Sequence, residues 1–93
     1  MPTSSAGMEN TMNNRKYIMC VVRGLFNELG FIRQYKGINY CAYALGDNYG
    51  SVSIDAVSAY YYINGHIGFL YPEDWDENSE DRVYDDIKAH MFS

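Results

Sequence analysis

The side chains with the greatest capacity for catalysis or metal binding are two histidines and two cysteines. Cys20 and Cys41 belong to no Cys-x-x-Cys pair, and His66 and His90 lie far apart in the sequence. Structural zinc sites usually gather closely spaced ligand pairs, so this spacing predicts no metal site and no cofactor. We expect reduced, partly buried thiols, an exposed His66 after a turn, and a His90 that caps the end of a helix or is simply exposed.

Local motifs of known catalytic machineries are absent from the sequence. The chain has no nucleophile elbow, zinc-protease motif, Walker loop or dinucleotide-binding fingerprint. The stretch 46–50 (GDNYG) contains glycines but lacks the Lys-Ser/Thr pair and the following helix of a phosphate-binding loop, so we interpret it as a hairpin loop. We therefore predict that the protein is not an enzyme, and we assign no catalytic residue.

The charged side chains are distributed unevenly along the 93 residues, which carry a formal net charge of −5. Residues 1–71 contain five basic and four acidic side chains, whereas residues 72–93 contain two basic and eight acidic ones. All of the net negative charge therefore lies in the final quarter of the chain. The net negative charge disfavours direct binding to nucleic acid or anionic membranes and favours a basic protein as partner, and the asymmetry indicates an interaction surface or a solvated helix face.

The acidic C-terminal segment is the principal candidate binding surface. Asp81 and Asp85 lie one helical turn apart, and Trp75 is a large aromatic residue among acids, which favours packing or binding. A helix over 79–92 would be about 20 Å long, so its carboxylates could approximate a row of DNA phosphates. The alternative interpretation is a solvated helix face. The candidate partner-binding residues are Glu73, Asp74, Trp75, Asp76, Glu77, Glu80, Asp81, Asp85 and Asp86.

The elements that must position these residues follow from the spacing of apolar side chains. Residues 14–29 repeat apolar side chains at helical spacing, and Gly30 stands where a helix-ending glycine belongs. A second apolar stripe predicts an acidic helix from residue 78 or 79 to about residue 91.

The segment between these helices is typical of antiparallel strands. We expect turns at Lys36-Gly37 and at Asn64-Gly65, the latter a type I′ hairpin. The chain is thus predicted to be an α+β domain of two layers: an N-terminal helix, a four- to five-stranded antiparallel sheet and a C-terminal acidic helix. The expected strands cover 31–35, 38–45, 51–57, 60–63 and 66–71.

Three consecutive tyrosines, Tyr60, Tyr61 and Tyr62, occupy one of the expected strands. Successive side chains of a strand point to opposite faces, so Tyr61 must face away from Tyr60 and Tyr62. One face of the sheet then presents aromatic rings to solvent or to a partner. We name the three tyrosines as a possible homodimer interface, because tyrosine is enriched at interfaces. The alternative is a helix over one face and partly exposed hydroxyls on the other.

Residues 1–13 are small and polar and are predicted to form a flexible N-terminal arm, followed by a single domain over 14–93. The sequence shows no signal-peptide layout and no apolar run long enough to cross a membrane. Two cysteines are too few for a disulfide scaffold. We therefore expect a cytoplasmic protein that contacts no membrane.

The size, the element order and the acidic stretch EDWDENSEDRVYDD (73–86) resemble those of small early proteins of large bacteriophages. Among these, the chain is most similar in style to the Arn-type antirestriction proteins of T-even phages. That resemblance implies a compact α+β DNA mimic that pairs as a dimer and blocks a restriction nuclease in the cytoplasm of the host cell. Anti-CRISPR proteins share the same style.

A second resemblance concerns other stretches of the chain. NELGFIRQYKGINYC (27–41) looks like the opening of the DNA-binding effector domain of the sporulation master regulator, and LYPED (70–74) and RVYDDIK (82–88) resemble its closing helices. That family is all-α and basic where it reads DNA, so the resemblance implies a helix-turn-helix regulator.

These observations together predict a non-enzymatic acidic inhibitor that acts as a DNA mimic. Its target would be a host DNA-binding or nuclease enzyme of a restriction or CRISPR system. Two alternatives stay open: an immunity or antitoxin-type protein that neutralises a basic nuclease toxin, and a helix-turn-helix regulator that binds DNA.

Overall fold

The computed structural model describes the backbone of residues 6–92 and the side chains of residues 14–92. The chain folds as a long helix, five strands, a short 3₁₀ helix and a second helix, which confirms the predicted α+β class. The elements are α1 (Ala6–Glu28), β1 (Ile32–Lys36), β2 (Tyr40–Leu45), β3 (Asn48–Ile54), β4 (Ala59–Ile63), β5 (His66–Leu70), η1 (Pro72–Asp74) and α2 (Ser79–Ala89).

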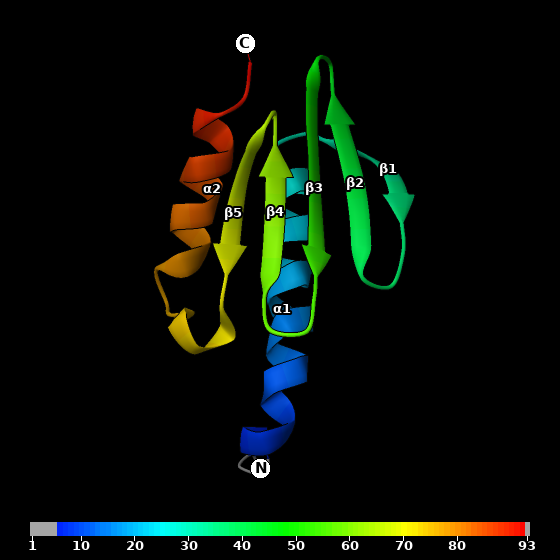
Figure 1. The fold of residues 1–93 in the computed structure, drawn as a ribbon. Coiled ribbons are helices and arrows are strands. Elements are labelled where there is room, and N and C mark those ends of the chain that lie inside the picture. The colour runs from blue at the N-terminus through cyan, green and yellow to red at the C-terminus, as the bar shows by residue number, and fades with distance from the viewer. Residues whose placement is uncertain (1–5, 93) are drawn as a thin grey trace.

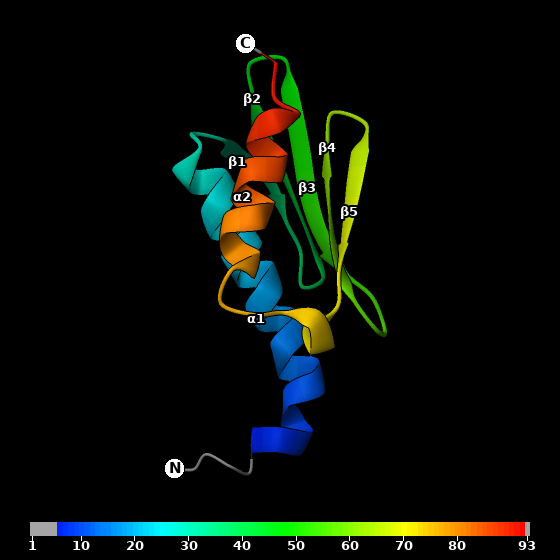
Figure 2. The same cartoon turned by 90° about the vertical axis from the view of Figure 1, so that its left-hand side faces the viewer.

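The five strands form one antiparallel sheet in the order β1-β2-β3-β4-β5, so each strand pairs with its neighbour in the sequence. Helix α1 crosses behind the middle of the sheet, and α2 lies beside its β4–β5 edge (Figure 1). The view turned by 90° shows both helices on the same side of the sheet (Figure 2). The molecule therefore has two layers, and one face of the sheet carries no helix.

The hydrophobic core lies between the sheet and the two helices. Its position follows from the alternation of strand residues, because every second side chain faces the helices. Gly50 on β3 belongs to this face, and a Cβ atom there would overlap the ring of Phe26 on α1. Gly24, in contrast, has open space beside it, so it does not serve close packing. Core residues include Ile18, Val22, Phe26, Cys41, Tyr43, Val52, Tyr61, Ile63, Val83 and Ile87.

The end of α1 is fixed by the glycine that the sequence indicates. Gly30 has a positive φ of 97°, and its N–H donates to the carbonyl of Asn27, while the N–H of Phe31 donates to the carbonyl of Phe26. This pair of bonds is a Schellman motif. The rings of Phe26 and Phe31 pack edge to face with their centroids 5.0 Å apart, which adds the apolar contact that commonly accompanies this motif.

The start of α1 and one loop differ from the prediction. The helix begins at Ala6, whereas the predicted arm covers residues 1–13, and residues 1–5 lie outside the described residues. The segment 6–13 (AGMENTMN) mixes good helix formers with glycine, asparagine and threonine and lacks a continuous apolar stripe, so its sequence does not predict a helix by itself. The predicted loop 46–50 is also wrong beyond Asp47, because β3 begins at Asn48 after a two-residue turn.

The Asn64-Gly65 hairpin is confirmed, with positive φ angles of 50° and 98° and with Ile63 paired to His66. The turn after Lys36 is longer than the predicted Lys36-Gly37 turn, because β2 begins only at Tyr40. The segment 27–41, which resembles an all-α effector domain, forms the end of α1, then β1 and the start of β2. None of the described helices is long and apolar enough to cross a membrane.

Candidate functional site

The acidic residues of the C-terminal segment lie on η1, on the connection to α2 and on α2 itself. Seven of them are exposed, and we call this set the acidic surface. Among the residues that the structure describes, only Asp76 of this set forms an ion pair, with Arg82 at 3.4 Å. The acidic surface consists of Glu73, Asp74, Asp76, Glu77, Glu80, Asp81 and Asp85.

Asp76 has a structural role at the start of α2. Its Oδ1 atom accepts a hydrogen bond from the backbone N–H of Asn78 at 2.8 Å and one from the hydroxyl of Ser79 at 3.2 Å. The Asn78 bond, with help from Ser79 and Arg82, holds the pKa of the Asp76 carboxyl below its ordinary value. Asp76 therefore orders the connection that carries its acidic neighbours.

Trp75 is half-buried and packs against the core. Its position among the acids is thus explained by packing in the folded chain. The ring also lines a cleft of about 400 Å³ between β5, η1 and α2, whose wall includes Tyr61, Arg82 and Asp86.

Asp86 does not belong to the acidic surface, although the sequence placed it there. It lies on the side of α2 that faces the sheet, where its carboxylate accepts hydrogen bonds from the hydroxyl of Tyr61 and from Nε2 of His66, the latter at 2.7 Å. Partial burial raises the pKa of the Asp86 carboxyl, but these hydrogen bonds outweigh it and hold the pKa below the ordinary value. Burial and the bond to Asp86 raise the pKa of Tyr61.

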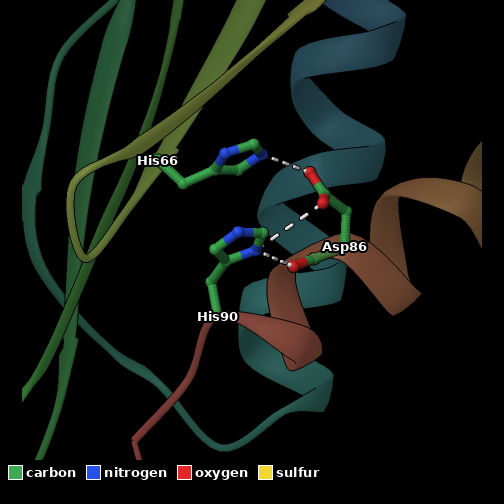
Figure 3. A group of neighbouring side chains, drawn as sticks. All are labelled: His66, Asp86 and His90. Carbon is green, nitrogen blue, oxygen red and sulfur yellow. Dashed lines mark hydrogen bonds and ion pairs between the residues drawn. The ribbon is translucent and has the colours of Figure 1, made fainter.

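His66, Asp86 and His90 form one cluster between β5 and α2 (Figure 3). The two imidazole rings are stacked, with centroids 3.9 Å apart and planes only 5° from parallel. Nδ1 of His90 donates to the backbone carbonyl of Asp86 at 2.8 Å and lies 3.6 Å from its Oδ1 atom. One ligating atom from each of the three residues lies within 4.8 Å of the others.

This cluster was not predicted from the sequence, in which His66 and His90 lie far apart and were interpreted as unrelated. One contact of the cluster could have been predicted from local spacing, because Asp86 and His90 are four positions apart and therefore lie on one face of a helix. The orientation of His66 could have been predicted from the alternation of side chains along β5, because His66 shares a strand face with Leu70, which packs against the core. The packing of α2 against β5 is a tertiary contact, and no local sequence pattern predicts it.

Several polar and packing contacts hold the cluster in place. A Cβ atom at Gly68 on β5 would overlap the Tyr61 ring, so the missing side chain allows the tyrosine to reach Asp86. The side-chain amide of Asn64 donates to the carbonyl of His90 at 2.8 Å and to Oδ1 of Asn48 at 2.9 Å. The end of α2 is therefore tied to the β4–β5 turn.

The tyrosines of β4 alternate as predicted. Tyr61 is buried beneath the helices, whereas Tyr60 and Tyr62 are partly exposed on the face of the sheet that carries no helix. Tyr61 therefore cannot belong to the homodimer interface proposed for all three tyrosines. The open face also carries other aromatic and apolar side chains, and we call this set the tyrosine face. It consists of Tyr35, Tyr40, Tyr49, Tyr60, Tyr62, Ile67 and Phe69.

Small residues line the middle of the tyrosine face. Ser51 and Ser53 on β3 are each 8% exposed although no helix covers them, because the surrounding tyrosines shield them. The hydroxyls of Tyr40 and Tyr49 share a hydrogen bond of 3.0 Å. The face is therefore an uncharged, largely aromatic surface.

The cysteines are both unpaired, with Cys41 buried in the core and Cys20 exposed on α1. Comparison with protein-family models, curated proteins and solved structures gave no match for this chain. Its function is therefore argued from the acidic surface, the tyrosine face and the cluster of His66, Asp86 and His90.

Proposed function

We propose that this protein is a non-catalytic inhibitor that binds a basic, nucleic-acid-binding protein through its acidic surface. The observation that supports this proposal is the set of six exposed carboxylates that have no ion-pair partner among the described residues. Like charges held this close destabilise the free protein slightly, and basic side chains of a partner would relieve that repulsion.

The arrangement of these carboxylates favours a partner that normally binds phosphates. Helix α2 has 11 residues and is therefore about 16 Å long, and η1 with its connection extends the acidic row. Duplex DNA presents one phosphate charge per about 1.7 Å of its axis. An acidic row of this length can occupy part of a groove that is built for a DNA backbone, as a DNA mimic does.

A matched pair of charge variants tests this proposal. Asp81→Asn/Asp85→Asn neutralises two carboxylates of the acidic surface, and Glu28→Gln/Asp47→Asn neutralises two exposed carboxylates elsewhere. Both variants therefore have the same net charge. Each immobilised protein is used to capture DNA-binding proteins from a lysate of the host, and the captured proteins are challenged with duplex DNA and with salt.

The proposal predicts a protein that the wild type and the control variant retain, that duplex DNA and salt release, and that Asp81→Asn/Asp85→Asn fails to hold. Equal retention by both variants would contradict it. The captured protein separates the functional alternatives: a restriction or CRISPR enzyme indicates counter-defence, whereas a toxic nuclease whose activity is blocked indicates an immunity protein.

We propose further that two copies of the chain associate through their tyrosine faces. Ile67 and Phe69 are 50% and 58% exposed there, although they are large apolar side chains. The tyrosine face contains no charged side chain, whereas the acidic surface lies in the other layer of the molecule. Two chains of net charge −5 can therefore meet at this face without placing their carboxylates against each other.

The size of the tyrosine face also suits a second copy. Five strands about 4.8 Å apart and about 17 Å long present roughly 400 Å² in projection. This is about half of the ~800 Å² per partner of a standard interface and is the size of a small or transient interface. Exposed patches of several hundred Å² on single chains are often functional.

Sedimentation of two lysine variants tests the dimer. Ile67→Lys places a charge in the tyrosine face, whereas Val57→Lys places the same charge on a 65% exposed apolar residue in the turn after β3. We expect the wild type and Val57→Lys to dimerise with rising concentration and Ile67→Lys to remain a monomer. A wild type that stays monomeric at all concentrations would show this proposal to be wrong.

A further inference from the structure

We propose that His66, Asp86 and His90 bind a divalent transition-metal ion, with Zn²⁺ as the representative ion. This site is separate from the acidic surface and from the tyrosine face, so the inference does not depend on either proposed function. It rests on the convergence of three side chains from two elements, as Figure 3 shows.

The separations of the candidate ligand atoms fit a single ion. Zinc binds imidazole nitrogen and carboxylate oxygen at about 2.0–2.2 Å, so two tetrahedral ligands lie roughly 3.4 Å apart. His66 Nε2 lies 2.7 Å from Asp86 Oδ2, and His90 Nδ1 lies 3.6 Å from Asp86 Oδ1. These values bracket the required separation, and the candidate ligand atoms of all three residues lie within 4.8 Å of one another. Because an ion lies near the plane of each imidazole that binds it, one of the two stacked rings must rotate out of the stack while the carboxylate turns.

The chemistry of the donors selects the class of ion. Two imidazole nitrogens and one carboxylate oxygen suit zinc and its neighbours, whereas Mg²⁺ and Ca²⁺ prefer oxygen ligands alone. On binding, the ion takes the place of the protons that His66 Nε2 and His90 Nδ1 direct toward Asp86. Each neutral ring then carries its proton on its other nitrogen, so no net loss of protons from the imidazoles is needed.

The surroundings of the cluster resemble the support that metal ligands usually have. The Tyr61 hydroxyl donates to the Asp86 carboxylate and restrains its orientation, as hydrogen-bonded neighbours of metal ligands do. Asn64 holds the carbonyl of His90. The side chains of His66, Asp86 and His90 remain 33%, 32% and 38% exposed, so an ion can enter and a water molecule can complete its coordination.

A bound ion would link the start of β5 to the end of α2, two segments that are otherwise joined there by hydrogen bonds. Because the ion would bind the folded chain and not the unfolded one, it would raise the melting temperature as its concentration increases. At a zinc concentration about 100 times the Kd, the expected rise is about 10 °C or more.

Calorimetric titration of the full chain, without a histidine tag, with ZnCl₂ tests the site directly. We expect one Zn²⁺ per chain, no binding of Mg²⁺, and a zinc-dependent rise in melting temperature. His66→Ala and His90→Ala should each weaken zinc binding more than about tenfold. Both positions are partly exposed, and circular dichroism verifies that each variant is folded.

Two control variants make this result specific. Cys20→Ser removes an exposed thiol that can bind zinc outside the cluster, and Asp85→Asn removes the carboxylate next to Asp86. Both should bind zinc like the wild type. The proposal is overturned if the wild type binds no zinc, if the His66→Ala/His90→Ala double variant still binds it, or if Cys20→Ser abolishes binding.

Discussion

The hydroxyl of Tyr61 on β4 donates a hydrogen bond to the carboxylate of Asp86 on α2. This bond joins the next-to-last strand of the sheet to the C-terminal helix and withdraws one carboxylate from the acidic surface. It also fixes Asp86 beside His66, so that one side chain serves both the packing of α2 and the histidine cluster.

Tyr61→Phe should destabilise the protein by about 1–2 kcal/mol, because it removes a hydrogen bond to a charged group while it keeps the buried ring. The pKa of Asp86 should rise toward its ordinary value, since the Tyr61 bond is one of the contacts that lower it. Urea denaturation and an NMR titration of the Asp86 carboxyl measure the two effects. Tyr62→Phe on the open face is the control, and an equal loss of stability in both variants would contradict the expectation.

Gly50→Ala and Gly24→Ala should change stability in opposite directions. A methyl group at Gly50 meets the Phe26 ring, and overpacking of this kind costs about 1–3 kcal/mol. A methyl group at Gly24 meets no atom within 4 Å and improves helix propensity by up to about 1 kcal/mol. Thermal unfolding of both variants measures the difference. A stable Gly50→Ala variant would show that the Phe26 ring moves aside easily.

The fold was accessible from the sequence where local patterns and tertiary packing agree. The stripe that contains Ile18 and Val22 predicted α1, and Gly30 and Asn64-Gly65 marked its end and a hairpin, because these positions require positive φ angles. The prediction failed at residues 48–50, which belong to β3, and there Gly50 makes room for the ring of Phe26. A glycine that accommodates a distant ring has the same sequence signature as a glycine in a turn.

The candidate site was accessible only in part. The segregation of charge is a property of composition, so the acidic surface could be read from the sequence. The roles of Trp75 and Asp86 could not, because each is determined by what α2 packs against. His66 and His90 meet for the same reason, through the docking of a helix on a strand that comes 20 residues earlier than Asp86.

Asn64 should have two separable roles, one in its backbone and one in its side chain. Asn64→Gly keeps a residue suited to the positive φ of 50° but removes the side-chain bonds to Asn48, to the carbonyl of His90 and from the N–H of Tyr49. Asn64→Ala removes these bonds and also strains the turn. We expect Asn64→Gly to lose about 1–3 kcal/mol and Asn64→Ala to lose more.

Urea denaturation measures the stability loss of both variants. The NMR resonances of His90 should broaden in Asn64→Gly, because the end of α2 is then released from the turn and exchanges between conformations. If the two variants lose the same stability, the left-handed backbone at this position costs alanine nothing and the turn argument is wrong.

Asp55 should make the stability of the folded protein decrease at acidic pH. Its Oδ1 atom accepts hydrogen bonds from the backbone N–H groups of Val57 and Ser58, which hold the pKa of the Asp55 carboxyl below its ordinary value near 3.8. A group with a lowered pKa in the folded state stabilises that state above its unfolded pKa. This contribution is lost as the pH falls from about 3.8 through the lowered value.

Asp55→Asn keeps an acceptor oxygen but removes the charge, so the variant should be less stable than the wild type near neutral pH. The difference between the two urea midpoints should shrink as the pH falls below 3.8, because the wild-type carboxylate is then protonated as well. Asp47→Asn is the control, since the Asp47 side chain is exposed and accepts no hydrogen bond from the residues described. A difference that stays constant from neutral pH to acid would show that the hydrogen bonds of Asp55 do not depend on its charge.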